Sequence, residues 1–421
     1  MQQLNLALAV MGATAVGIAL MSSALKRSPV TESILAVAVG IAVGPYGLAL
    51  LDLAEWGEET AILEQASRLT LAIGLMGVAL RIKRDSLKVL WRPMMVLLTI
   101  AMLAMWLASS LLAGWLLGLP LWAALLFGAV VTPTDPVVAS TIVTGTFAKK
   151  HLPLRIRDGL SLESGANDGL AYLFVMLPIF MLTVAPGEAW SKWLLESVLV
   201  GVVFASALGC VIGFCAARLL SLAERHRLVD NTSLLGYSVA FSLFTLGFAE
   251  LLGADAIISV FLAGLTFNLV SDKNDEHEEE KIQEGVAKLF TLPMFVIFGI
   301  ALPFAEWIEL GWPLLVLTLL ILILRRPPIL LMLYPALRHY WATPDVRFIG
   351  WFGPIGIAAI YYANLAHKHM DQPVFWHAGS AIVFASILVH GITAAPLTRL
   401  YARHAGVPPE GARVLSRSDD E

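Results

Sequence analysis

An aspartate stands between two prolines in the stretch "VVTPTDPVVAS", inside a segment that is otherwise apolar. Pro133 and Pro136 each remove a backbone donor and obstruct regular helix, so a helix through this segment is expected to break here. Broken helices leave free carbonyl oxygens that bind small ions, and Asp135 adds formal charge. Thr132 or Thr134 can add hydroxyl or carbonyl oxygens. The pattern favours a small-cation site over its alternative, a proline kink with an aspartate that reaches back to water.

A second polar cluster follows in "GLSLESGANDGLAYLFV". On a helix, Ser164 and Asp168 are four residues apart and share a face, while Glu163 and Asn167 share a neighbouring stripe. The two glycines of "SGANDG" have the spacing that lets another helix approach closely. Asp168 lies well inside the apolar run, where an ionisable side chain is costly and typical of a functional site. The cluster predicts an oxygen-rich face beside a tightly packed one.

Two adjacent arginines interrupt the apolar run "LILILRRPPILLMLY". A cation at that depth needs an acidic partner, and Glu163 is the natural candidate for Arg325 or Arg326. Such a pair would hold two helices in register. One of the two arginines could instead extend to the membrane surface, but not both.

The composition is that of a polytopic membrane protein. Of 421 residues, 58% are hydrophobic and 14% charged, and the mean hydropathy is +0.78. Soluble domains carry roughly 25% charged residues. Apolar runs long enough to cross a bilayer recur along the chain and give about thirteen predicted spans. They lie near 4–24, 31–52, 65–82, 93–117, 121–146, 157–184, 191–221, 232–252, 254–271, 286–305, 311–335, 347–366 and 376–400.

A second interrupted helix is expected in "WFGPIGIAAIYYA", where Gly353, Pro354 and Gly356 fall inside span twelve. Spans one to six and eight to thirteen form two six-span halves, and the span between them makes the halves face opposite ways. Interrupted helices at matching positions of such halves indicate a transporter site. The predicted fold is therefore an all-α polytopic membrane protein with two inverted six-helix repeats and crossing broken helices. Asp135 is expected to neutralise the positive helix ends at the crossing.

Basic residues set the expected orientation. The positive-inside rule places the loops after odd-numbered spans in the cytoplasm, so the N-terminus is expected outside and residues 401–421 form a short cytoplasmic tail. The first apolar stretch has no basic region before it and is predicted as a span, not a cleaved signal. The basic residues of these loops are Lys26, Arg27, Lys83, Arg84, Lys149, Lys150, Arg155, Arg225, Arg227, Arg338 and Arg403.

These motifs resemble the monovalent cation/proton antiporters. "TPTDPV" followed by "ESGANDG" is similar to the NhaP-type branch, and "WFGPIGIAAIYYA" is similar to the plasma-membrane sodium/proton antiporters of fungi and their bacterial relatives. The resemblance covers the chain up to residue 400. The sequence departs from the commoner pattern at Ile355, where many relatives carry a basic residue.

The resemblance implies a core bundle, 88–185 and 310–400, that moves against an interface part, 1–84 and 191–306, through which two copies form a homodimer. It implies that Asp168 is the essential ion-binding carboxylate and that Glu163 pairs with the arginine before proline, Arg326. Asn167 fills the place where the electrogenic branch has a second aspartate. The neighbours implied for a bound Na⁺ are Asp135, Ser164 and Thr134.

Charge alone suggests how such a site would work. A carboxylate in a narrow cavity loses hydration, so a proton and a small cation compete for the same oxygens. Hard oxygen ligands suit Na⁺ or Li⁺. If only the loaded site can cross the membrane, exchange is obligatory, and one proton per ion is the simplest ratio. Transport of K⁺ stays an alternative. The cations and protons are cargo, so no cofactor is expected.

Other function classes fit the sequence less well. Two intramembrane aspartates can form a protease dyad, but the chain has no G-x-G-D stretch, no H-E-x-x-H and no nucleotide-binding loop, so an enzyme is not expected. A channel would line its pore with repeated rings of groups. A sodium-coupled symporter would need further specificity groups. The expected partners are monovalent cations, protons, lipid and a second copy, with no nucleic acid.

Overall fold

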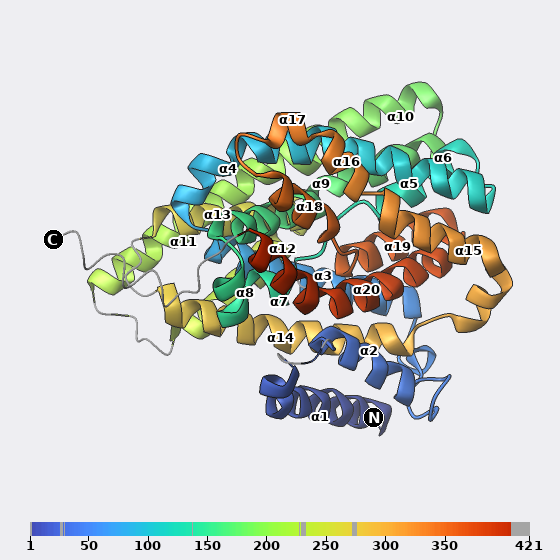
Figure 1. Cartoon of the computed structure of the whole chain (residues 1–421), viewed down its shortest axis with the longest axis horizontal. Helices are drawn as coiled ribbons and strands as arrows, with labels where there is room; N and C mark the ends of the chain where they lie inside the picture. The colour runs from blue at the N-terminus through green and yellow to red at the C-terminus, as the bar shows by residue number, and fades with distance from the viewer. Residues whose placement is uncertain are drawn as a thin grey trace.

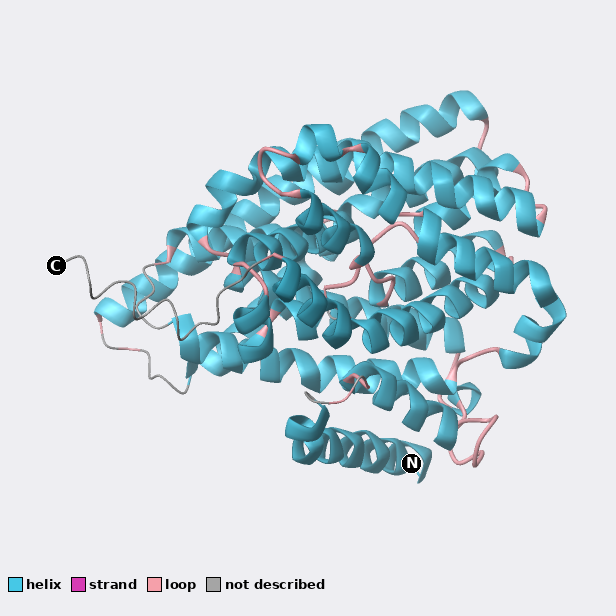
Figure 2. Ribbon diagram, in the orientation of Figure 1, coloured by secondary structure: helices cyan, strands magenta, loops and turns pink. Residues whose placement is uncertain are grey.

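The computed structural model describes residues 2–25, 28, 30–136, 138–226, 228, 233–271 and 276–405. Within these ranges the secondary structure is helical, with no strand (Figure 2). The predicted tail lies outside the described residues from 406 onward, as do Lys26, Arg27 and Arg227. The predicted all-α membrane architecture is therefore observed.

Seven helical stretches among the described residues are long and apolar enough to cross a membrane. They are Gln3–Ser22, Glu59–Arg81, Arg84–Leu117, Leu154–Thr183, Pro186–Arg225, Phe304–Met332 and Val374–His404. Shorter apolar helices occupy Glu32–Val43, Leu121–Val130, Gly236–Leu251, Ala256–Val270 and Gly285–Ile300. Every predicted span overlaps a helix, but the count of spans stays a prediction.

The first half of the chain runs from the peripheral helix α1 to the central helix α9 (Figure 1). Its elements are α1 (Gln2–Leu25), α2 (Glu32–Val43), η1 (Leu53–Glu55), α3 (Glu59–Arg81), α4 (Arg84–Val96), η2 (Leu97–Ala101), α5 (Met102–Leu117), α6 (Leu121–Val130), α7 (Ser140–Val143), α8 (Gly145–His151) and α9 (Leu154–Thr183).

The second half begins with one long helix, α10 (Pro186–Lys192), η3 (Trp193–Phe204) and α11 (Ala205–Arg225), which runs without a break. It continues with α12 (Ser233–Leu251), α13 (Ala256–Val270), α14 (Glu276–Ile300), α15 (Phe304–Leu324), α16 (Pro327–Met332), α17 (Tyr334–Leu337), α18 (Thr343–Trp351), α19 (Ile357–Met370) and α20 (Val374–His404).

Helices α3 and α9 form the centre of the molecule. In the most apolar window of each, 67% and 61% of residues are buried, against 17% for α1. Close packing around α9 depends on its glycines, because a Cβ on Gly165 would meet the ring of Phe261 and one on Gly169 would meet Ile258. Both partners lie on α13, so the spacing seen in "SGANDG" does allow a close helix neighbour.

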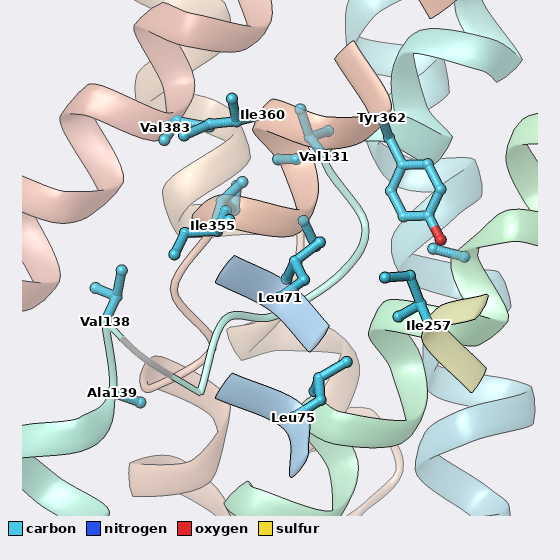
Figure 3. Close-up of a cluster of buried hydrophobic side chains, with 14 of the residues drawn as sticks. Leu71, Leu75, Val131, Val138, Ala139, Ile257, Ile355, Ile360, Tyr362 and Val383 are labelled. Carbon is cyan, nitrogen blue, oxygen red and sulfur yellow. The ribbon is translucent and has the colours of Figure 1, made fainter. Parts of the chain in front are cut away.

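Two helices are interrupted where the sequence predicts. Helix α6 ends at Val130, and residues 131–136 and 138–139 form no regular helix before α7. Helix α18 ends at Trp351, and α19 begins at Ile357. Figure 3 shows the first segment, with Val131 and Val138, passing the segment of Ile355.

A third interruption was not predicted. Span eleven was expected to be continuous over 311–335, but α15 ends at Leu324 and α16 begins at Pro327. Proline disfavours helix at the residue before it, which explains the break at Arg326. The two arginines therefore stand at a helix break, where their side chains can turn inward.

Helices α2 and α14 pack through glycines, which gives a test of the fold. A Cβ on Gly299 would lie 3.0 Å from Gly40 Cα and from Ile41 N, both backbone atoms that cannot move aside easily. Gly299→Val should therefore destabilise the protein by about 1–3 kcal/mol, the usual cost of overpacking. The unfolding midpoint in detergent measures the effect. Gly12→Val is the control because nothing lies within 4 Å of its Cβ position, and equal midpoints for the two variants would contradict the observed packing.

Candidate cation site

The two interrupted helices meet at Asp135. Its backbone N–H donates to the carbonyl of Pro354 at 2.8 Å, which joins the two non-helical segments. Its carboxylate accepts the N–H of Ile357 at 2.5 Å and that of Val138 at 3.3 Å. Asp135 is thus a negative charge at the N-terminus of α19, where the helix dipole is positive. This is the position that the sequence predicted for it.

Glycines at the second break give the charged side chains room. A Cβ on Gly356 would collide with the carboxylate of Asp135, and one on Gly353 would collide with the side chain of Arg326. Any larger residue at either position would push a buried charge out of place. The glycines of "GPIG" are therefore needed for close approach, in addition to ending a helix.

Asn167 fastens the segment of Thr134 to α9. Its amide oxygen accepts the Thr134 N–H at 3.1 Å, and its amide nitrogen donates to the Thr134 hydroxyl at 2.8 Å. The Thr134 hydroxyl also lies 3.0 Å from the hydroxyl of Ser164. Both polar ends of the Asn167 amide are therefore engaged, and this residue positions Thr134.

Asp168 lies one helical turn beyond Ser164 and is 0% exposed. Neither of its carboxylate oxygens has a hydrogen-bond partner among the described residues. An unpaired carboxylate is expensive to bury, so this group must be neutralised by a proton or a cation. Its backbone carbonyl accepts the hydroxyl of Tyr362 at 2.6 Å. Tyr362 lies in the stretch "WFGPIGIAAIYYA", but no local pattern of the sequence marks its hydroxyl as part of the site.

Glu163 forms a buried ion pair with Arg326. One guanidinium nitrogen contacts Oε1, the other donates to Oε2 at 2.7 Å, and Nε donates to the carbonyl of Ile349 at 3.0 Å. Of the two arginines that the sequence offered, Arg326 is therefore the partner. Arg325 is also buried, at 2% exposure, which excludes the alternative in which one arginine extends to the membrane surface. The break before Pro327 turns both side chains inward.

The guanidinium of Arg325 instead binds backbone carbonyls. It donates to Val131, Thr132 and Pro133 in the first non-helical segment and to Gly353 in the second. This role was not predicted from the sequence, because no acidic residue marks it. The sequence places two arginines at this depth but offers only one acidic partner. This mismatch could have indicated that the second arginine binds groups other than a carboxylate.

The charges buried around the crossing do not cancel. Asp135, Glu163 and Asp168 carry three negative charges, and Arg325 with Arg326 carries two positive ones, which leaves one negative charge. Asp135 and the arginines have fixed partners, so the uncompensated charge belongs to Asp168. One monovalent cation or one proton would balance it.

In the described part of the chain, one cavity lies against each end of α3. One, of about 360 Å³, is lined by Asp52, Glu59, Glu306 and Asn364, among others. The other, of about 60 Å³, is lined by Glu32, Arg81, Pro136, Ser140 and Lys288, among others. Asp168 lines neither.

Buried apolar side chains surround the crossing. Figure 3 shows Leu71 and Leu75 of α3 and Ile257 of α13 in the cluster around the crossing. Leu71 and Leu75 are at most 2% exposed. Asp168 itself is 0% exposed, so its carboxylate is closed to solvent in this structure.

Comparison with known proteins assigns the chain to one family. The pattern that describes the transmembrane sodium/hydrogen exchangers matches residues 11–400. The Na⁺/H⁺ antiporter 2 of Zygosaccharomyces rouxii is 33% identical over 350 residues, which are 81% of this chain and 43% of the relative. The K⁺/H⁺ antiporter NhaP2 of Shewanella sp. MR-4 is 25% identical over 90% of this chain and 64% of the relative. The chain thus spans under half the length of the yeast relative.

The fold also matches a solved structure. The sodium proton antiporter MjNhaP1 from Methanocaldococcus jannaschii superimposes with a TM-score of 0.73, covering 95% of this chain and 98% of that one. The sequence identity is 18%. This similarity supports the helix arrangement described above.

The buried ion pair makes a stability prediction. Glu163→Gln and Arg326→Gln should each destabilise the protein by about 3–5 kcal/mol, because each leaves a buried charge without its partner. The double variant should lose much less than the sum of the two. Unfolding midpoints and folded yield in detergent measure this. Lys88→Gln is the control, since its pair with Asp85 is exposed and worth about 0–1 kcal/mol; additive losses in the double variant would refute the coupling.

Proposed function

The chain belongs to the sodium/hydrogen exchanger family, and we propose that it exchanges Na⁺ for H⁺ across a membrane by alternating access. The observation that carries the proposal is the carboxylate of Asp168, which is fully buried with neither oxygen hydrogen-bonded among the described residues. Such a group holds either a proton or a cation, and the two exclude each other. The single uncompensated charge at the crossing supports exchange of one proton for one ion.

Asp168 is the principal ligand in this proposal. The Ser164 hydroxyl lies one turn away on the same face of α9, and the Thr134 hydroxyl lies 3.0 Å from it. In the proposal these oxygens complete the set for Na⁺. Asp135 contributes negative charge, although its carboxylate also accepts two backbone N–H groups. All these donors are hard oxygens, which suit an alkali cation.

Alternating access would follow from movement of the core bundle, 88–185 and 310–400, against the interface part, 1–84 and 191–306. Each cavity is lined from both parts, which supports this division: the larger by Glu59 and Asn364, the smaller by Arg81 and Ser140. A small displacement of one part would open one cavity toward Asp168 and close the other.

The cation and the assembly are further elements of the proposal. Exchange of K⁺ is the alternative, because the relatives include a K⁺/H⁺ antiporter as well as Na⁺/H⁺ antiporters.

We place the chain in the plasma (inner) membrane as a homodimer, with its N-terminus outside and its C-terminus in the cytoplasm. Arg84 supports this orientation, since it donates to the carbonyl of Asn268 at 3.1 Å, so the ends of predicted spans three and nine lie on one side.

Proteoliposomes with an imposed pH gradient test the function. Addition of Na⁺ should dissipate the gradient, with K⁺ and Li⁺ compared in turn, and Asp168→Asn should be inert because its amide cannot exchange a proton for a cation. Asp85→Asn is the matched control, since the Asp85 side chain is 94% exposed, and it should transport normally. Exchange by Asp168→Asn at the unmodified rate would overturn the site.

Competition between protons and cations gives a pH dependence. Lowering the pH raises the concentration of the competing proton, so the apparent KM for Na⁺ should rise, approaching about tenfold per pH unit where the site is mostly protonated. The maximal rate at saturating Na⁺ should stay nearly constant. Initial rates across a Na⁺ series at several pH values measure this. A constant KM with a changing maximal rate would exclude a shared site.

A further inference from the structure

We infer that Arg325 is the positioning residue for this exchange: its fixed charge holds the two interrupted helices together at the crossing, in place of a basic residue at Ile355. The inference deepens the proposed function and rests on it. It concerns how the ligand oxygens are held in place, not which ion they bind.

The contacts of Arg325 carry the inference. Nη1 donates to the carbonyls of Val131 at 2.6 Å, Thr132 at 2.8 Å and Pro133 at 3.3 Å. Nη2 donates to the carbonyl of Gly353 at 2.5 Å. These carbonyls follow the C-terminal ends of α6 and α18, where the helix dipoles are negative. One guanidinium therefore satisfies both negative ends, as Asp135 satisfies the positive end of α19.

The shape of the side chain matters as well as its charge. The planar fork of arginine presents several donors in fixed directions and stays protonated in proteins. It can therefore reach both segments at once, with one nitrogen on each. Lysine at this position would carry a point charge that suits one segment better than the other.

Ile355 shows why the charge must come from elsewhere. Its side chain is 0% exposed and lies in the apolar cluster of Figure 3, and its N–H donates to the Ser386 hydroxyl at 2.7 Å. The non-helical segment between α18 and α19, residues 352–356, thus carries no cation of its own. The additional arginine at the break before Pro327 supplies it from another helix.

The same contacts connect Arg325 to the proposed ligands. The carbonyls that it holds directly precede Thr134, and Gly353 directly precedes Pro354, whose carbonyl accepts the Asp135 N–H. Without Arg325 the first segment can shift relative to α9, and the Thr134 hydroxyl then moves away from the Ser164 hydroxyl, the neighbouring oxygen of the proposed site. The expected consequence is weaker cation binding rather than loss of the exchangeable group.

Moving the positive charge from position 325 to position 355 tests the inference. Arg325→Gln should raise the KM for Na⁺ by about tenfold or more, the effect of losing charge-assisted hydrogen bonds, with a smaller change in maximal rate. Arg325→Lys should be milder. Adding Ile355→Arg to Arg325→Gln should restore the KM at least in part. Arg326→Gln is the matched control: this arginine is equally buried but pairs with Glu163, so Ile355→Arg should not rescue it.

A second readout does not depend on transport. Amide hydrogen exchange in detergent should accelerate in peptides that cover the two non-helical segments of Arg325→Gln, and relocation of the charge should reverse this. If the unmodified protein shows no cation-dependent proton movement, the proposed function fails, whereas the exchange data still decide the role of Arg325. An unchanged KM and unchanged amide exchange in Arg325→Gln, or equal rescue of Arg326→Gln, would overturn the inference.

Discussion

Helix ends are costly in the middle of a membrane, and the structure depends on how they are neutralised. Interruption of α6 and α18 leaves backbone carbonyls and N–H groups without helical partners, where lipid offers none. Asp135 accepts the N–H of Ile357 at the start of α19, and Arg325 donates to the carbonyls that follow α6 and α18. The crossing therefore needs one fixed charge of each sign. The glycines of "GPIG" are the condition for bringing these charges close enough.

This arrangement separates the charges that must stay from the one that can change. Asp135, Arg325 and the pair of Glu163 with Arg326 are all bound to protein groups. Asp168 alone among them has carboxylate oxygens without a partner in the described part of the chain. A single variable charge in an otherwise neutralised site gives the simplest basis for coupling, because whatever neutralises it must be exchanged for something of equal charge.

Local sequence rules predicted the elements of this site but not all of their contacts. Prolines and glycines mark the breaks at Pro133 and Pro354 because they act on the adjacent backbone. Helical spacing places Ser164 and Asp168 on one face of α9 for the same reason. The role of Arg325 could not be predicted, because its partners are carbonyl groups that every residue carries. The hydroxyl of Tyr362 likewise finds a carbonyl that only tertiary packing brings near.

The contacts inside the proposed core bundle differ from those along its boundary with the interface part. Under the proposed division, the buried pair of Glu163 with Arg326 lies entirely inside the core and need not break during transport. Across the boundary, Lys368 of α19 meets Glu64 of α3 at 3.2 Å, and the lysine is 57% exposed. The Glu64 side chain is only 9% exposed, so the pair is half-buried, and separating it would leave a poorly hydrated carboxylate. The rest of that surface includes Leu71 and Leu75, whose dispersion contacts have no fixed direction and can be remade after a small slide. In the proposed exchange, the fixed charges would preserve the site while the boundary beside it moves.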